Sequence, residues 1–486
     1  MDRDVSATRN ILGIIMTSFC GMLPSSLLAG EACPELPDSE LSAHMLYIDE
    51  HGNLLNPLTR KQVINETTYV QHILNHFDEA RQQAGLPSHI TIFIHGGLNT
   101  WEKAIDRPRT RTTCMMAAGT YPIFIGWSSN PTGNYWDHLA RLRRGSRWSW
   151  PMGVATAPFV LLEDIARSVV RTLPALSKEV REPFLNVANQ LSRPELSSAM
   201  KSADKQALGA LNQRLSLHTS GEGVLDSYWS VGNPAKLLTA PLTDGLGTGI
   251  WQSLLRRTDF VLDRSADYEN STPTDPADPD HANTAATYFL NKLEQQQATT
   301  ISLVGHSMGT LVATNILARH PGLKIQHVVF MGAAAPLKSL ESVVAPWLIK
   351  NPSASFYNLS LDPDLEVSER NFGDLLPRGS LLNWIDGIFA SVNSFKDRTA
   401  GDWSNIAQTA AEIFGSGCNG KMGTVCVAQQ VHLTRFGVGA DRGPQKHGDF
   451  DEYCFWQKEY WEPAENSVIR RFPDCAPLAK SARGDR

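Results

Sequence analysis

The sequence Gly305-His306-Ser307-Met308-Gly309 places a serine between two glycines at a spacing that suits a nucleophile. The apolar run 299–304 precedes it, and apolar residues at helical spacing follow it: Leu311, Val312, Ile316 and Leu317. A strand that turns sharply into a helix needs residues without bulk two positions before and after the serine. Such a corner strains the serine backbone and exposes its hydroxyl, so we expect Ser307 to be a nucleophile. A strand–loop–helix connection that merely contains glycines is the alternative.

A serine hydroxyl attacks at neutral pH only if a base takes its proton and a carboxylate orients that base. On such a corner the expected chain order is serine, acid, then histidine. His447 lies in a Gly-rich loop that precedes an aromatic cluster of Tyr453, Phe455, Trp456, Tyr460 and Trp461. We therefore favour His447 as the base. His432 is the competitor, but the alternating run 427–436 predicts a strand, in which a histidine is packed or solvated by default.

The acid is expected after the next-but-one strand that follows the serine. Asp362-Pro363-Asp364 comes directly after the β-like run 355–361. An acid that reaches back to the serine usually lies a few residues beyond the strand, so we favour Asp364 over Asp362. Glu366 is a weaker candidate, and an ordinary turn rich in Asp and Pro is the alternative.

Backbone amides are also needed to stabilise the negative charge that develops on the substrate oxygen. His95-Gly96-Gly97-Leu98 ends the β-like run 90–94, and glycines there allow an amide to approach the substrate. The first donor is Gly97 or Leu98, which the sequence does not separate, and the second is expected from Met308. No cysteine or histidine cluster has the spacing of zinc ligands.

Several β-like runs alternate with amphipathic helical patterns along the chain. The runs are 90–94, 121–127, 299–304, 325–331 and 354–361, and the clearest helical pattern is 283–297. This alternation predicts an α/β protein with a mostly parallel sheet flanked by helices. We divide it into an N-terminal core part at 33–137, a helical cap or lid insertion at 138–280, and a C-terminal core part at 281–486.

The insertion has a distinctive composition. Arg141, Arg143, Arg144 and Arg147 lead into Trp148 and Trp150, and apolar residues then recur at helical spacing over 162–173. Basic residues beside tryptophans and an amphipathic helix are typical of a peripheral contact with a membrane. The alternative is a cap that buries its apolar face on the catalytic domain.

The N-terminal segment 1–32 predicts export. Arg3 and Arg9 precede the apolar stretch 11–29, and small residues follow near Ala29–Ala32, as in a cleaved signal peptide. An uncleaved membrane anchor is the alternative. The six cysteines beyond this segment form an even set that suits disulfides, with Cys418–Cys426 as the favoured local pair. We therefore expect a periplasmic or secreted protein that can associate with a membrane.

Together these motifs resemble the α/β-hydrolase superfamily, on its lipase and serine esterase side. The resemblance is carried by 93–97, 305–309, Asp364 and His447, and by the segment 127–137, and it covers about 90–136 and 283–461. It implies transfer of the acyl group of a carboxylic ester, lipid-like or not, to water through a serine acyl-enzyme, without metal or cofactor. The substrate is not fixed by this fold, which hosts many activities.

Two other functions remain open at this stage. A non-catalytic envelope protein would keep the scaffold and bind a membrane surface through the insertion, and an acyltransferase would pass the acyl group to an alcohol instead of water. The net charge of −6 is mild and the chain has no basic field, which argues against a nucleic-acid partner.

Overall fold

The computed structural model describes most of the chain from Cys33 to Cys475. The described ranges are 33–143, 146–147, 149–170, 212–215, 234–264, 283–296, 298–370, 378–390, 392–415, 426–464 and 467–475. The predicted export signal, 1–32, and the preferred cysteine partner Cys418 lie outside these ranges.

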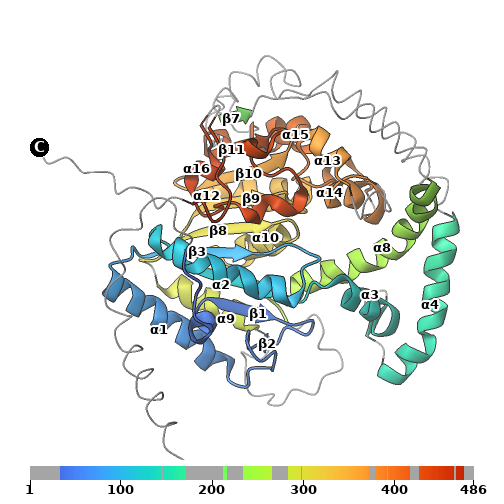
Figure 1. The fold of residues 1–486 in the computed structure, drawn as a ribbon, viewed down its shortest axis with the longest axis horizontal. Helices are drawn as coiled ribbons and strands as arrows, with labels where there is room; N and C mark the ends of the chain where they lie inside the picture. The colour runs from blue at the N-terminus through green and yellow to red at the C-terminus, as the bar shows by residue number, and fades with distance from the viewer. Residues whose placement is uncertain are drawn as a thin grey trace, which may run out of the picture.

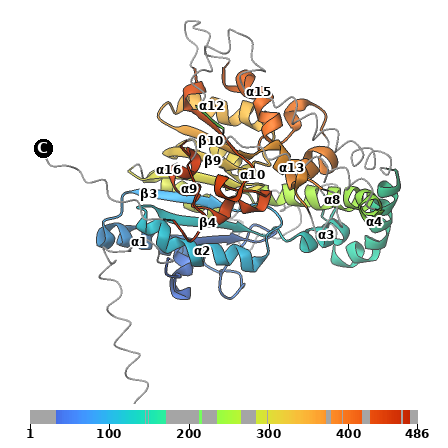
Figure 2. The same cartoon turned by 45° about the horizontal axis from the view of Figure 1, so that its top comes forward.

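A mostly parallel sheet forms the centre of the molecule, with the strand order β2-β1-β4-β3-β8-β9-β10-β11-β7 (Figures 1 and 2). The strands are β1 (Met45–Ile48), β2 (Leu54–Leu55), β3 (His89–Ile94), β4 (Tyr121–Trp127), β7 (Asn212–Leu215), β8 (Thr300–His306), β9 (Ile325–Met331), β10 (Ser355–Leu361) and β11 (Val431–Phe436). Among these strands only β1 and β2 pair antiparallel. The predicted α/β fold class, with its mostly parallel sheet, is therefore confirmed.

Helices cover both faces of the sheet. One face packs on α1 (Glu66–Ala84), α9 (Ala285–Gln295), α10 (Gly309–Arg319) and α15 (Trp403–Gly415). The other packs on α2 (Trp101–Ala117) and on the aromatic segment that ends in α16 (Lys458–Trp461). Buried strands with two covered faces must be apolar on both, which is why the predicted runs were nearly continuous in apolar residues.

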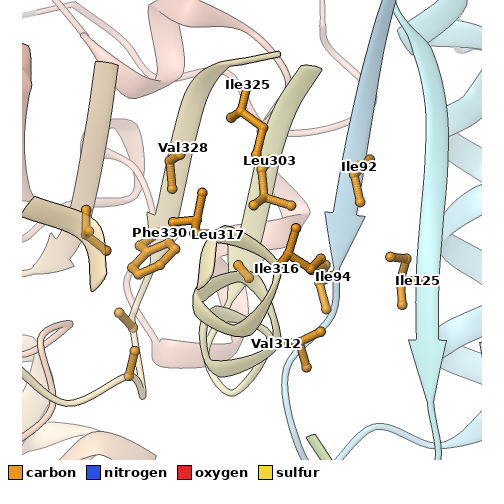
Figure 3. Packing of buried hydrophobic residues seen from close by; sticks show 14 of the residues in the cluster. Ile92, Ile94, Ile125, Leu303, Val312, Ile316, Leu317, Ile325, Val328 and Phe330 are labelled. Carbon is orange, nitrogen blue, oxygen red and sulfur yellow. The ribbon is translucent and has the colours of Figure 1, made fainter. Parts of the chain in front are cut away.

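Successive residues of a strand point to opposite faces, and β3 illustrates this alternation. Ile92 and Ile94 join the cluster around α10, while Phe93 joins the aromatic cluster on the opposite face. Figure 3 shows Val312 and Ile316 of α10 beside Ile94, with Phe330 close to Leu317. This packing anchors α10, the helix that directly follows the serine corner.

The remaining elements are short or lie between β4 and α9. Between β4 and α9 the chain forms α3 (Pro131–Ala140), β5 (Leu142–Arg143), β6 (Ser146–Arg147), α4 (Trp150–Val170) and α8 (Pro234–Phe260). The short elements are η1 (Asp38–Ala43), α11 (Leu337–Ser339), η4 (Leu340–Val344), α12 (Ala345–Lys350), α13 (Pro363–Ser368), α14 (Leu381–Trp384), η5 (Ile385–Phe389), η6 (Phe395–Asp397), η7 (Ala428–Gln430), η8 (Ala440–Arg442) and η9 (His447–Glu452).

Two disulfides fasten peripheral segments to the core. Cys33–Cys114 ties the start of the described chain to α2, and Cys454–Cys475 closes the C-terminal segment on itself. Within the described ranges, none of the helices combines the length and hydropathy that a membrane crossing requires.

Candidate active site

Ser307 occupies the sharp corner between β8 and α10. Its φ of 52° lies in the left-handed region, where the backbone of a residue other than glycine is strained. A Cβ atom on Gly309 would lie 2.8 Å from the carbonyl oxygen of His95, and one on Gly305 would lie 3.0 Å from Thr310. The two flanking glycines are therefore needed for the chain to make this turn against β3.

His447 meets this serine from the other end of the chain. Its Nε2 atom lies 2.8 Å from Oγ of Ser307, although the two residues are separated by 140 positions. The backbone of His447 is held on both sides: its N–H donates to Glu369 Oε2 at 2.9 Å, and its carbonyl accepts from Nε2 of His306 at 3.0 Å. Phe450, fully buried one turn later, anchors the short helix η9 in the aromatic cluster.

His432, the competing base, lies elsewhere. It is near the start of β11, where its ring stacks on Tyr357 with centroids 4.6 Å apart, and its Nδ1 lies 3.4 Å from Glu462. The structure thus brings His447, and not His432, to Ser307.

The histidine at the site is held neutral by its surroundings. Burial lowers the pKa of His447 to about 3; the neighbouring His306 acts in the same direction and Asp451 opposes it. At neutral pH the imidazole therefore carries no charge. Its Nε2 can accept the proton of the serine hydroxyl, which is what a general base must do.

The ring of His447 has no carboxylate partner among the described residues. The Nδ1 atom of His447 is buried, and it makes no hydrogen bond with any residue in the described ranges. Asp364 lies in the first turn of α13, where its N–H donates to Asp362. The structure therefore brings Ser307 and His447 together but gives no contact between His447 and Asp364.

The two rival acids are engaged in other contacts. Asp362 caps α13 through Oδ1, and its Oδ2 lies 3.6 Å from Nε of the buried Arg435. Glu366 accepts a hydrogen bond from Ser380. Burial raises the pKa of Glu366 well above its usual value, with a further contribution from Asp402. Neither carboxylate is therefore placed to orient His447.

The loop after β3 lies directly against the nucleophile. A Cβ atom on Gly96 would come within 2.8 Å of Ser307 Cβ, and one on Gly97 within 2.6 Å of Met308 Sδ. The N–H of Leu98 donates to the carbonyl of Ser129 at 3.1 Å, so it is already engaged. The amides of Gly97 and Met308 donate to no backbone acceptor in the described part of the chain, which leaves both available to an anionic oxygen.

A buried ionic network that the sequence did not reveal supports the loops that carry Gly96 and His447. Arg107 on α2 forms an ion pair with Asp451 of η9 and donates to Asn99 Oδ1 at 3.0 Å. Asn99 in turn donates to the carbonyl of Gly96 at 2.8 Å. Burial by itself would raise the pKa of Asp451, but the charges of Arg107, His306 and Arg111 hold it below its usual value. Asp451 is therefore an ionised anchor for the histidine loop.

Glu369 is another residue that sequence reasoning missed. It comes directly after α13 and accepts the N–H of His447. Burial raises the pKa of Glu369, and that hydrogen bond opposes the rise. The one signal for Glu369 in the sequence was its position a few residues beyond the end of β10, similar to that of Glu366.

One pocket lies apart from these residues. It is lined by His89, Ser302, His327, Trp456 and Lys458, among others. Because His89 begins β3 while Ser307 follows the end of β8, the pocket opens at the opposite edge of the sheet from the nucleophile. No group of three or more His, Cys, Asp or Glu residues within the described ranges is arranged to hold a metal ion.

Comparison of the chain with protein-family models, with curated proteins and with solved structures gives no match.

Proposed function

We propose that the protein is an exported serine hydrolase that cleaves carboxylic esters, with the α/β-hydrolase arrangement that its motifs resemble. The observation that carries this proposal is the 2.8 Å contact between Ser307 Oγ and His447 Nε2 at a corner where the serine has a positive φ. A scaffold that only binds partners has no need for a strained serine beside a buried, neutral imidazole.

The reaction proceeds in two halves. Ser307 Oγ attacks the ester carbonyl while His447 Nε2 takes the hydroxyl proton, and the carbonyl oxygen becomes an oxyanion. The C–O bond to the leaving group then breaks, and the proton on His447 passes to the leaving alcohol, which gives an acyl-enzyme. Water repeats the sequence with His447 again as base, and it releases the carboxylic acid and free Ser307.

The amides of Gly97 and Met308 are the proposed donors to the oxyanion. Met308 directly follows Ser307, Gly97 packs against Met308, and neither amide donates to a backbone acceptor in the described residues, whereas the Leu98 amide is occupied by Ser129. Donors that are already oriented stabilise the charge as it develops, because nothing has to reorganise during the reaction. Gly97 is therefore favoured over Leu98.

Asp364 remains the proposed acid. It lies in the first turn of α13, directly beyond the end of β10, where the resemblance to α/β-hydrolases puts the acid. Asp364→Asn should lower kcat by about 10⁴-fold, because an amide in place of the carboxylate favours the wrong tautomer of the imidazole. Glu369→Gln is the informative companion variant: if it, and not Asp364→Asn, removes the activity, then the acid is Glu369.

Export is proposed from the N-terminal segment and the disulfides together. Cys33–Cys114 and Cys454–Cys475 are the kind of crosslink that persists in an oxidising compartment. A periplasmic or secreted location accounts for both features.

The direct test of function is turnover of nitrophenyl esters over a range of acyl chain lengths. Ser307→Ala and His447→Ala should each abolish hydrolysis, while His432→Ala, which removes an imidazole from β11, should leave kcat unchanged. Equal activity of the wild type and Ser307→Ala would refute the proposal. The chain length that is cleaved fastest then separates a long-chain lipase from a short-chain esterase.

A further inference from the structure

The helix α4 has its apolar residues on the outside. Its large hydrophobic side chains are exposed, with Phe159 70%, Leu162 60% and Val169 69% accessible. The same surface carries Met152, Val154, Leu161, Ile165 and Val170. Figures 1 and 2 show α4 at the rim of the molecule, with α3 and α8 lying between it and the sheet.

The face of α4 that is buried is small or polar. It consists of Gly153, Ala157, Asp164 and Ser168, which share one side of the helix at helical spacing. Ser168 donates to the backbone carbonyl of Asp164 at 2.9 Å, and it faces Gly245 of α8 so closely that a Cβ atom there would collide with its hydroxyl.

Hydrogen bonds between helices complete the buried side. The Asp164 carboxylate, 1% exposed, accepts from Tyr135 OH at 3.1 Å and lies 3.1 Å from His138 Nε2, both on α3. Gly153 packs against Ala140, where α3 ends. The inner side of α4 is thus joined by close backbone approach and polar contacts.

This arrangement is the reverse of a surface helix in water. A helix in water buries its apolar stripe and exposes its polar one, because burial of apolar area drives packing. When hydrocarbon surrounds a helix, that driving force disappears between helices. Small residues and interhelical hydrogen bonds then make the contact, and the apolar side chains face outward. The polarity of α4 therefore fits an apolar surrounding.

The sequence that leads into α4 indicates which apolar surrounding this is. Arg141, Arg143, Arg144 and Arg147 immediately precede the helix in the chain, whereas Arg167 in its last turn is already paired with Glu163 and Asp164. A basic segment that adjoins an apolar helix in the sequence suits the anionic headgroups of a lipid surface. A helix with one apolar and one polar side lies in the plane of such an interface, with its apolar side toward the acyl chains.

The position of α4 connects this surface with the nucleophile. The helix α3 begins four residues after the end of β4, at the same edge of the sheet as the corner that holds Ser307. The helix α8 packs on α4 and also on α10, which starts at that corner. A lipid layer bound to α4 would therefore lie on the side of the molecule where the serine is reached.

We propose that the outward face of α4 docks on an anionic lipid surface. The face is defined by Met152, Val154, Phe159, Leu161, Leu162, Ile165, Val169 and Val170. The proposal goes beyond ester hydrolysis and does not depend on it. It can be tested on Ser307→Ala, so that cleavage of the lipid does not interfere.

The test is flotation of the full chain with vesicles of phosphatidylcholine, with and without phosphatidylglycerol. Phe159→Glu combined with Leu162→Glu should weaken binding to the anionic vesicles by about a hundredfold, roughly tenfold for each large apolar group that no longer leaves water. The matched control is Ile64→Glu with Val468→Glu, which changes two exposed apolar residues elsewhere, 101% and 68% accessible, and adds the same charge.

A local readout removes any contribution from the N-terminal segment. An environment-sensitive fluorescent amino acid in place of Phe159 should shift its emission to the blue when anionic vesicles are added, and the same probe in place of Ile64 should not. Absence of the shift at 159 would overturn the proposal, whether or not the protein floats. A dimer in solution that Phe159→Glu with Leu162→Glu converts to a monomer, with no shift at 159 on vesicles, would assign the face to a second copy instead.

Discussion

Arg107 and Asp451 form a buried ion pair that joins α2 to η9, the short helix that begins at His447. The two side chains are 12% and 4% exposed, and the residues are 344 positions apart. Because Arg107 also binds Asn99, which holds the carbonyl of Gly96, a single guanidinium positions the loops on both sides of Ser307.

Replacing this arginine should therefore damage both stability and activity. Arg107→Gln leaves the Asp451 carboxylate buried without its main partner, which should cost about 3 kcal/mol of unfolding free energy. Arg109, two positions after Arg107, forms an exposed ion pair with Asp38. Arg109→Gln should therefore lower the unfolding free energy by about 0.5 kcal/mol or less. Urea unfolding measures both values. Equal losses in the two variants would show that the ion pair is not an anchor.

The pH dependence of hydrolysis should reflect the low pKa of the base. Burial places the pKa of His447 at about 3, below the ordinary histidine value of 6.5, so the neutral, active form persists as the pH falls through 6.5 and is lost only near pH 3. The acid limb of kcat/KM should accordingly lie well below pH 6.5. A limb at pH 6.5, in protein shown to be folded by circular dichroism, would contradict this environment for His447.

Gly96 should not tolerate a methyl group. A Cβ atom there would lie 2.8 Å from Ser307 Cβ and 3.2 Å from the carbonyl oxygen of His306, so Gly96→Ala must displace the nucleophile. A shift of that size should lower kcat/KM by about a hundredfold. Gly133→Ala is the matched control, because a Cβ atom there meets nothing within 4 Å. Full activity of Gly96→Ala would mean that this loop does not contact the serine.

The disulfides Cys33–Cys114 and Cys454–Cys475 should differ in their effect on stability. A crosslink removes more conformational entropy from the unfolded chain when it closes a longer loop. The separation of 81 residues for Cys33–Cys114 predicts a loss of about 4.5 kcal/mol on replacing both cysteines by alanine. The separation of 21 for Cys454–Cys475 predicts about 3 kcal/mol. Chemical denaturation gives both values, and the reverse order would speak against this entropic account.

The sequence predicted the central strands and the serine corner because their signals are local. The runs at 121–127 and 325–331 coincide with β4 and β9, since a doubly covered parallel strand must be apolar throughout. The glycines around Ser307 could also be interpreted from the sequence. Only glycine fits at position 309, where the turn lies against the backbone of Ile94 and His95. The contact of His447 with Ser307 followed from chain order together with the Gly-rich loop around His447, since His432 satisfies the same order but lies in a predicted strand.

Contacts between distant charged residues could not be predicted in this way. Nothing in the local pattern around Arg107 points to Asp451 or Asn99, and nothing around Glu369 points to the amide of His447. The direction of α4 was also ambiguous, because a periodic apolar stripe does not tell whether it faces the protein or the outside. The structure shows that the stripe faces outward, because Leu162 and Val169 are exposed.

The most direct test of the account is covalent labelling by a fluorophosphonate, which reacts only with an activated serine. Intact mass and peptide mapping should find one adduct, on Ser307, that is lost in Ser307→Ala and strongly slowed in His447→Ala. An unlabelled wild-type protein that is fully folded, or an adduct that persists in Ser307→Ala, would contradict the central claim that His447 activates Ser307.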